Sequence, residues 1–277
     1  MYYVKCADGV VECSIRKNAK QSRIVVGDKV SIEKNEYDKG KYIITNVFPR
    51  KNYIPRPYIA NIDKLLMVVA PIPKPDFYLI DKLIVYCNLN NIEPILVINK
   101  IDISNEGFVE DIKKQYYFLK IFEVSAKNND GIEVLKKYIS NTFCVLTGQS
   151  AVGKSSLINA LIPNKNLETQ DLSAKIERGK HTTRVNELYI YDDLVICDTP
   201  GFSSLSLDIK YTELCGFYPE FSDYIGDCKF LDCSHIKEGK DCKIVSRVEV
   251  GEINKDRYSR YIDLYNNLKK EWDSKYD

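Results

Sequence analysis

The chain has 277 residues, of which 44% are hydrophobic and 29% are charged, and its formal net charge is +1. This composition is ordinary for a soluble globular protein, no apolar run approaches the roughly 18 residues of a membrane span, and the N-terminus lacks a signal-peptide pattern. The nine cysteines, an odd number, favour free thiols or a metal site over disulfides, so we expect a cytoplasmic protein without a membrane segment.

Residues 1–58 carry 12 lysines and arginines but only six acidic residues, so this segment is basic and the remainder is mildly acidic. A basic all-β module of this size fits a small five-stranded oligonucleotide-binding barrel that contacts a phosphate backbone. Periodicity leaves another small barrel open, and a solvated lysine-rich surface explains the charge equally well. The predicted strands are 10–15, 28–32 and 42–47.

From Ile59 the pattern changes to apolar strands alternating with helices, which is typical of an α/β domain with a mainly parallel sheet. The predicted strands are 64–70, 95–98, 121–124, 143–146, 187–191 and 194–197. This rhythm stops at about Leu207. The sequence therefore predicts a barrel in 1–58, an α/β domain in 59–207, and a mainly helical, metal-binding segment in 208–277.

A glycine-rich loop follows the predicted strand 143–146 and leads into a predicted helix. Its sequence is Gly148-Gln149-Ser150-Ala151-Val152-Gly153-Lys154-Ser155, the Gly-x4-Gly-Lys-Ser form of loops that bind nucleotide phosphates. We expect its backbone N–H groups to form an anion nest at the start of the helix. The next residue, Ser156, is also an expected nucleotide-binding residue. Lys154 would reach the β- and γ-phosphates, and the Ser155 hydroxyl would coordinate Mg²⁺.

A second motif, Asn99-Lys100-Ile101-Asp102, has the Asn-Lys-x-Asp form that reads guanine. The Asp102 carboxylate can accept two hydrogen bonds from guanine, and adenine has no such paired donors. Asn99 would bond guanine N7, and the Lys100 stem would pack along the base. The turn Ser125-Ala126-Lys127, after the next predicted strand, would offer the Ala126 N–H to guanine O6.

The order of these two motifs is reversed relative to an ordinary GTPase, in which the phosphate loop comes first. The order predicts a circularly permuted P-loop GTPase domain. Permutation leaves the site intact, because a site is defined by geometry and not by chain order. Each motif also falls at the C-terminal end of a predicted strand, where open α/β sheets bind ligands.

The remaining expected contacts to Mg²⁺ and the γ-phosphate come from two later segments. Asp198-Thr199-Pro200-Gly201 offers the Asp198 carboxylate to Mg²⁺ through water, and the Gly201 N–H can sense the γ-phosphate. The stretch 178–184 has the composition of a mobile first switch. Thr182 or Thr183 in it would ligate Mg²⁺, and spacing does not choose between them.

The group that orients the attacking water is harder to assign. Many GTPases have a glutamine directly after the glycine that corresponds to Gly201. This chain has Phe202 there, which cannot hydrogen-bond water. His181 is the nearest candidate by chemistry, and the alternative is a surface histidine of the switch. The expected catalytic residues are therefore Lys154, His181 and one of the two switch threonines.

A cluster of soft ligands lies near the C-terminus, where Cys228, Cys233, His235 and Cys242 fall within 15 residues. Three thiolates and one imidazole fit a closed tetrahedral Zn²⁺ site with a structural role, one ion per chain. Cys215 could substitute in principle, although its surroundings are more apolar. The other cysteines read most simply as core residues: Cys6, Cys13, Cys87, Cys144 and Cys197.

Together these motifs resemble ribosome small subunit-dependent GTPase A (RsgA), a bacterial family of circularly permuted GTPases, over nearly the whole length. Residues 148–159, 179–183 and 198–202 carry the resemblance, and the family usually has glycine at the position of Ala151. The resemblance implies GTP hydrolysis to GDP and phosphate that the small ribosomal subunit stimulates. It also implies contact with the rRNA of that particle and a role in its late maturation. We expect a monomer.

Two alternatives remain at this stage. One is a permuted GTPase of large-subunit assembly, which is disfavoured because such relatives lack this pairing of N-terminal barrel and C-terminal Cys/His segment. The other is a GTP-dependent RNA-binding scaffold with negligible hydrolysis, which the residue Phe202 keeps open.

Overall fold

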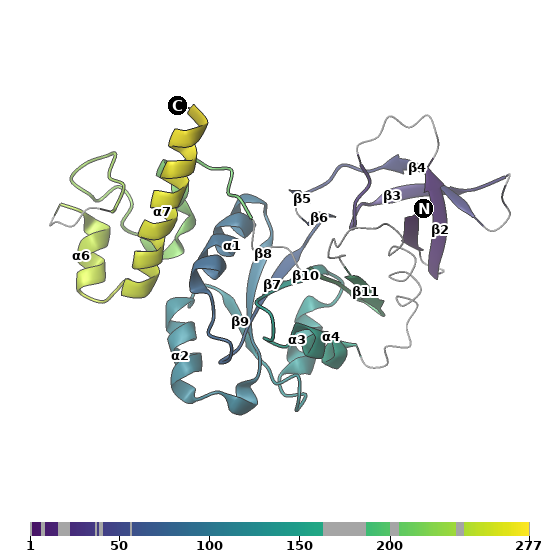
Figure 1. The fold of residues 1–277 in the computed structure, drawn as a ribbon, viewed down its shortest axis with the longest axis horizontal. Helices are drawn as coiled ribbons and strands as arrows, with labels where there is room; N and C mark the ends of the chain where they lie inside the picture. The colour runs from purple at the N-terminus through teal and green to yellow at the C-terminus, as the bar shows by residue number, and fades with distance from the viewer. Residues whose placement is uncertain are drawn as a thin grey trace.

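The computed structural model describes residues 2–6, 9–15, 23–36, 38, 41–55, 57–162, 187–199, 205–236 and 241–276. A small β-sheet lies at one end of the molecule, a larger sheet with helices lies in the middle, and α6 and α7 lie at the other end (Figure 1). Among the described residues, no helix combines the length and apolar character needed to cross a membrane.

Within the described residues, the N-terminal sheet contains four strands in the order β1-β2-β4-β3. The first two form an antiparallel hairpin, β2 pairs with β4 in parallel, and β3 pairs with β4 antiparallel. Three of the strands match the predicted ones, and β1 is an addition that the alternation did not indicate. The strands are β1 (Tyr2–Cys6), β2 (Gly9–Ile15), β3 (Val30–Lys34) and β4 (Tyr42–Val47).

A short hairpin of β5 (Tyr53–Pro55) and β6 (Tyr58–Ala60) connects this sheet to the central one. Gly27 packs so closely against this hairpin that a Cβ there would lie 2.1 Å from the Ala60 carbonyl oxygen. Its φ of +87° is a second reason for glycine at this position. The buried Asn52 side chain exchanges two 2.8 Å hydrogen bonds with the backbone of Ile62. The connection is therefore a packed part of the fold.

In the part of the chain that the structure describes, the central sheet has six strands in the order β11-β12-β10-β7-β8-β9. All neighbouring pairs are parallel except β11 with β12. Buried β-branched and aliphatic residues make up most of its inner strands, as expected for a sheet covered on both faces. The strands are β7 (Lys64–Val69), β8 (Glu93–Ile98), β9 (Lys120–Glu123), β10 (Phe143–Thr147), β11 (Glu187–Tyr191) and β12 (Leu194–Asp198).

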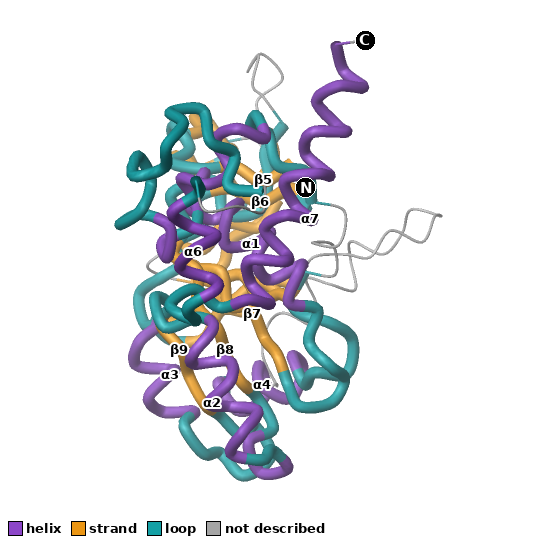
Figure 2. The backbone as a smooth tube through the Cα atoms, turned by 90° about the vertical axis from the view of Figure 1, so that its left-hand side faces the viewer, coloured by secondary structure: helices purple, strands orange, loops and turns teal. Residues whose placement is uncertain are grey.

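Helices cover both faces of this sheet (Figure 2). Successive residues of β7 enter two different cores. Leu65 and Met67 face the core that contains α1 (Phe77–Leu89) and α2 (Glu106–Gln115), whereas Leu66 and Val68 face the other. This alternation follows from the two-residue period of a strand. The second core contains α3 (Ile132–Ile139) and α4 (Lys154–Leu161).

The C-terminal unit, residues 205–276 as described, packs on the first core. Buried aromatic rings join its helices, including Tyr261, whose ring meets those of Tyr218 and Phe221 nearly edge to face. The long helix α7 lies beside α1 (Figure 1). The elements of the unit are η3 (Tyr211–Phe217), η4 (Pro219–Phe221), α6 (Lys243–Glu249) and α7 (Lys255–Tyr276).

Candidate functional site

The predicted motifs meet at one edge of the central sheet. Asn99 follows β8, Ser125 follows β9, Gly148 follows β10, and Asp198 is the last residue of β12. These strands are parallel to one another, so their C-terminal ends lie at the same edge. Segments that are far apart in the sequence therefore form one site.

The phosphate loop needs its glycines for two reasons. Gly148 and Gly153 adopt φ values of +153° and +95°, which side chains rarely tolerate. A Cβ at Gly148 would lie 2.4 Å from the Val68 carbonyl oxygen, and one at Gly153 would lie 2.4 Å from Asn99 Nδ2. The loop thus packs on β7 and on the base-reading motif without room for a methyl group.

Two lysines donate hydrogen bonds to carbonyl oxygens of this loop. The Lys154 ammonium donates to the carbonyl oxygens of Gly148 and Gln149 at 2.9 and 3.0 Å. Ala151 has φ +66°, and its carbonyl oxygen accepts a 2.7 Å hydrogen bond from the Lys100 ammonium. The base-reading lysine therefore holds the one alanine in a left-handed conformation within the loop.

Asn99 joins the phosphate loop to both base-reading segments and is almost fully buried. Its Nδ2 donates to the Val152 carbonyl oxygen at 3.0 Å, and its Oδ1 accepts the Ala126 N–H at 3.1 Å. The expected guanine-binding N–H of Ala126 is thus hydrogen-bonded to Asn99. Asn99 fixes the spacing between the phosphate loop and the base site.

Asp102 is held by the second of the base-reading segments. Its Oδ1 accepts a 2.7 Å hydrogen bond from the buried Ser125 hydroxyl, which in turn accepts the Asn128 N–H at 3.2 Å. Lys127 is exposed beside them. The Ser125 hydrogen bond orients the carboxylate from one side. A carboxylate that must pair with two adjacent donors of a base needs such a fixed orientation.

The phosphate side is described in part. Ser150, Ser155 and Ser156 are exposed at the loop and at the start of α4, and Asp198 is half-buried. His181, Thr182, Thr183, Gly201 and Phe202 lie outside the described residues.

Sequence reasoning missed two residues near this site. The buried Thr199 hydroxyl donates to the Leu146 carbonyl oxygen at 3.1 Å and ties the end of β12 to β10. The Ile72 carbonyl oxygen accepts from the Lys100 ammonium at 3.1 Å. For Thr199, the signal in the sequence was its place in the Asp198–Gly201 motif. For Ile72, the prolines at 71, 73 and 75 mark its segment as irregular.

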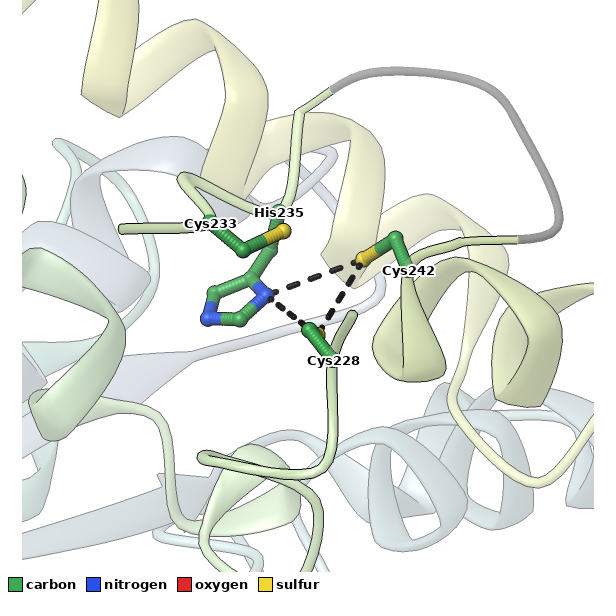
Figure 3. A group of neighbouring side chains, drawn as sticks. All are labelled: Cys228, Cys233, His235 and Cys242. Atoms are coloured by element: carbon green, nitrogen blue, oxygen red, sulfur yellow. Dashed lines mark hydrogen bonds between the residues drawn. The ribbon is translucent and has the colours of Figure 1, made fainter. Parts of the chain in front are cut away.

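A separate group of metal-ligating side chains lies in the C-terminal unit. The donor atoms of Cys228, Cys233, His235 and Cys242 all lie within 4.8 Å of one another and face a common centre (Figure 3). His235 Nδ1 is 3.5 and 3.6 Å from the sulfurs of Cys228 and Cys242, which are 3.9 Å apart. A tetrahedron with Zn–S of about 2.3 Å and Zn–N of about 2.0 Å has edges of about 3.5–3.8 Å. Cys228, His235 and Cys242 therefore fit three corners of a tetrahedral zinc site, and Cys233 lies within 4.8 Å of them as the fourth ligand.

The surroundings of this group suit metal binding. Burial lowers the pKa of His235, which favours the neutral imidazole that ligates metals. Burial raises the pKa of Cys242 to about 12, so a cation is needed to hold it as a thiolate. The Tyr258 hydroxyl donates to the His235 carbonyl oxygen at 2.8 Å and fixes the ligand segment on α7. Cys215 does not belong to the group.

The other cysteines are free thiols with no metal partner among the described residues. Four of the five are buried, as predicted for core residues, and Cys6 is half-buried: the buried ones are Cys13, Cys87, Cys144 and Cys197.

The sheet order, with the base-reading motif ahead of the phosphate loop in the chain, defines a circularly permuted P-loop GTPase. The family model for the RsgA GTPase matches residues 47–208, more than half of the chain. The chain therefore belongs to the RsgA GTPase family.

Curated relatives named small ribosomal subunit biogenesis GTPase RsgA match nearly the whole chain. The relative from Caldanaerobacter subterraneus is 37% identical over 99% of this chain and 94% of its own length. The relative from Clostridium acetobutylicum is 39% identical, with 96% and 93% covered.

Two solved structures have the same fold. YjeQ from Thermotoga maritima gives a TM-score of 0.78 at 34% identity and covers 95% of this chain and 91% of its own. YloQ, described as a circularly permuted GTPase, gives 0.77 at 27% identity, with 98% and 91% covered.

Proposed function

We propose that this chain is a GTPase of small ribosomal subunit biogenesis that hydrolyses GTP to GDP and phosphate. The observation that carries the nucleotide assignment is the Asn99 side chain, which bonds the phosphate loop at Val152 and the base-site turn at Ala126. The names of the relatives, at 37–39% identity over nearly full length, support the biological role.

Guanine would be read by Asp102, with its carboxylate held by Ser125, and by Asn99 and Lys100. Lys154 and the backbone N–H groups of the phosphate loop would bind the phosphates. An adenine base would leave the Asp102 carboxylate without its two donors, so we expect strong selection against ATP.

Mg²⁺ would be held by hard oxygen ligands, which this edge of the sheet offers. Ser155 lies in the first turn of α4, which follows β10 and the phosphate loop. Asp198 ends the adjacent β12, in parallel register with Leu146. Bound Mg²⁺ would neutralise charge that develops on the phosphate oxygens. Thr182 or Thr183 would complete the ligands, and the Gly201 N–H would contact the γ-phosphate. These roles are proposals.

A structural Zn²⁺ bound by Cys228, Cys233, His235 and Cys242 is the second part of the proposal. Its support is the three donor separations among Cys228, His235 and Cys242, which fit the edges of a tetrahedron, together with the position of Cys233 within 4.8 Å of them and the burial of His235 and Cys242. With four protein ligands the ion has no open position for substrate, so its contribution would be to the stability of the fold.

The partner would be the small ribosomal subunit and its rRNA. The basic charge of residues 1–58 suits contact with RNA phosphates, and the protein would act as a cytoplasmic monomer. The three proposed domains remain 1–58, 59–207 and 208–277, with the family match of 47–208 supporting the central one. The name shared by the relatives disfavours large-subunit assembly, and a scaffold with negligible hydrolysis is the alternative that kinetics must test.

Single-turnover hydrolysis of GTP, measured with and without purified small subunits, tests the proposal. We expect slow hydrolysis by the free protein and faster hydrolysis with small subunits but not with large ones. Binding without any stimulated hydrolysis would favour the scaffold. ATP competing with GTP at equal concentration would refute the guanine assignment.

A further inference from the structure

Helix α1 is connected to the phosphate loop through the segment that precedes it. The Asp76 N–H, at the start of α1, donates to the Gln149 side-chain oxygen at 3.2 Å. The Lys100 ammonium bridges the Ala151 and Ile72 carbonyl oxygens. The segment from Ile72 to Asp76 therefore supports the phosphate loop from outside at two points.

One turn further along α1, Asp81 is buried in a cluster of charged side chains. Its side chain is 1% exposed and accepts hydrogen bonds from the Tyr116 hydroxyl at 2.7 Å, from Arg260 Nε at 2.6 Å, and from Arg257. Both arginines belong to α7 of the C-terminal unit. Three donors thus converge on a single carboxylate of the GTPase domain.

The two arginines extend this cluster to other elements. Arg257, 2% exposed, also bonds Glu220 of η4, and Arg260 donates to Gln115 of α2 at 2.9 Å. Two carboxylates and two guanidinium groups balance one another in charge. The cluster therefore joins α1 and α2 to η4 and α7.

The same part of α7 holds the segment with the metal ligands. The Tyr258 hydroxyl donates to the His235 carbonyl oxygen, and the Tyr261 hydroxyl donates to that of Ser234, both at 2.8 Å. A continuous set of contacts therefore runs from the phosphate loop through α1 and Asp81 to α7 and the metal-ligand segment.

Stability alone does not account for a buried charged cluster. Well-packed apolar residues of similar volume are often as stabilising as a buried ion pair, or more so. Hydrogen bonds from a planar guanidinium, in contrast, require one relative orientation of donor and acceptor. Such bonds specify one geometry between two packed elements through their direction, whereas the burial of apolar surface is non-directional.

We propose that Asp81, with Arg257 and Arg260, forms a rigid joint by which the C-terminal unit positions α1 and, through α1, the phosphate loop. The proposal rests on the nucleotide site proposed above. Asp81 is a positioning residue, since it acts through Asp76 and Gln149. Coupling between two sites is reciprocal, so nucleotide binding should also stabilise the metal-ligand segment.

Hydrogen–deuterium exchange of the zinc-loaded wild-type protein tests, without any mutation, whether nucleotide binding stabilises the metal-ligand segment. We expect saturating GDP to slow exchange about threefold or more in peptides covering 228–236 and 255–268. Fluorescence of N-methylanthraniloyl-GDP (mant-GDP) verifies saturation. Unchanged exchange in both peptides at full saturation would overturn the joint, whereas a failure to bind mant-GDP would refute the nucleotide site itself.

The claim that the joint positions the phosphate loop is tested by the mant-GDP affinity of Asp81→Asn. Glu110→Gln, on the surface of α2, is the matched control. We expect Kd to rise about fivefold or more in Asp81→Asn, the lower end of typical coupling, and to change less than about twofold in the control. Arg260→Lys keeps the charge and serves if Asp81→Asn does not fold. A Kd within about twofold of wild type in the folded variant would overturn the proposal.

Discussion

Replacing Asp81 with asparagine should lower the free energy of unfolding by about 3–5 kcal/mol, the usual cost of removing one partner from a buried ion pair. The wild-type cluster of Asp81, Glu220, Arg257 and Arg260 has balanced charge. The substitution leaves one buried positive charge in excess, and the amide can replace only part of the three hydrogen bonds that Asp81 accepts.

A double-mutant cycle separates this charge effect from a simple loss of contacts. Arg260→Met removes one positive charge at a position that is 14% exposed and should cost about 1.5–3 kcal/mol. The double variant restores charge balance. It should therefore be more stable than the sum of the single effects predicts, by about 1 kcal/mol or more.

Urea unfolding of the zinc-loaded protein, followed by the fluorescence of Trp272 in α7, measures these differences. Trp272 is the only tryptophan of the chain. Glu110→Gln removes an exposed ion pair with Lys113 and should change stability by less than about 0.5 kcal/mol. Additive effects in the cycle, or a loss of under about 1 kcal/mol for Asp81→Asn, would refute the argument from buried charge.

The remaining predictions concern the two sites and the core thiols. Elemental analysis should find one zinc per chain, and Cys233→Ser should lose it; full zinc content in that variant would contradict the ligand set. His181→Ala should lose the turnover stimulated by small subunits but still bind GTP, whereas Lys154→Ala should lose nucleotide binding; stimulated turnover within about twofold of wild type would return His181 to a surface role. Burial raises the pKa of Cys197 to about 12 and of Cys144 to about 11, so each thiol stays protonated in the folded state while the unfolded thiol ionises from about pH 9. The contribution of each protonated thiol to the free energy of unfolding is present below that pH. It is lost as pH rises, by about 1.4 kcal/mol per pH unit for each thiol. Urea midpoints measured from pH 8 to 10 should therefore fall less steeply in Cys197→Ala than in the wild type.

Local patterns predicted much of this structure because the features they report are local. The motif order predicted the permutation, and buried runs such as 64–70 predicted the strands of the central sheet. Asp81 was not predictable in this way. It is one of several polar residues in the amphipathic pattern of α1. Its partners Arg257 and Arg260 lie 176 and 179 positions away. Only the docking of the C-terminal unit on α1 turns an ordinary helical aspartate into a buried one.

The permutation also determines where the flanking units attach. The central domain begins at β7, which follows the β5–β6 hairpin, and its last strand is β12, which precedes the C-terminal unit. These two strands are the immediate neighbours of β10, the strand that leads into the phosphate loop. In the ordinary order, β12 would instead continue through a helix toward β7, and neither strand would carry a chain end of the domain. Because the permuted chain is cut at this connection, both flanking units attach to strands beside the phosphate-loop strand. Buried Leu205 and Leu207 then anchor the start of the C-terminal unit in the core that α1 shares. The two flanking units are therefore joined in sequence to the two strands that lie on either side of the phosphate-loop strand.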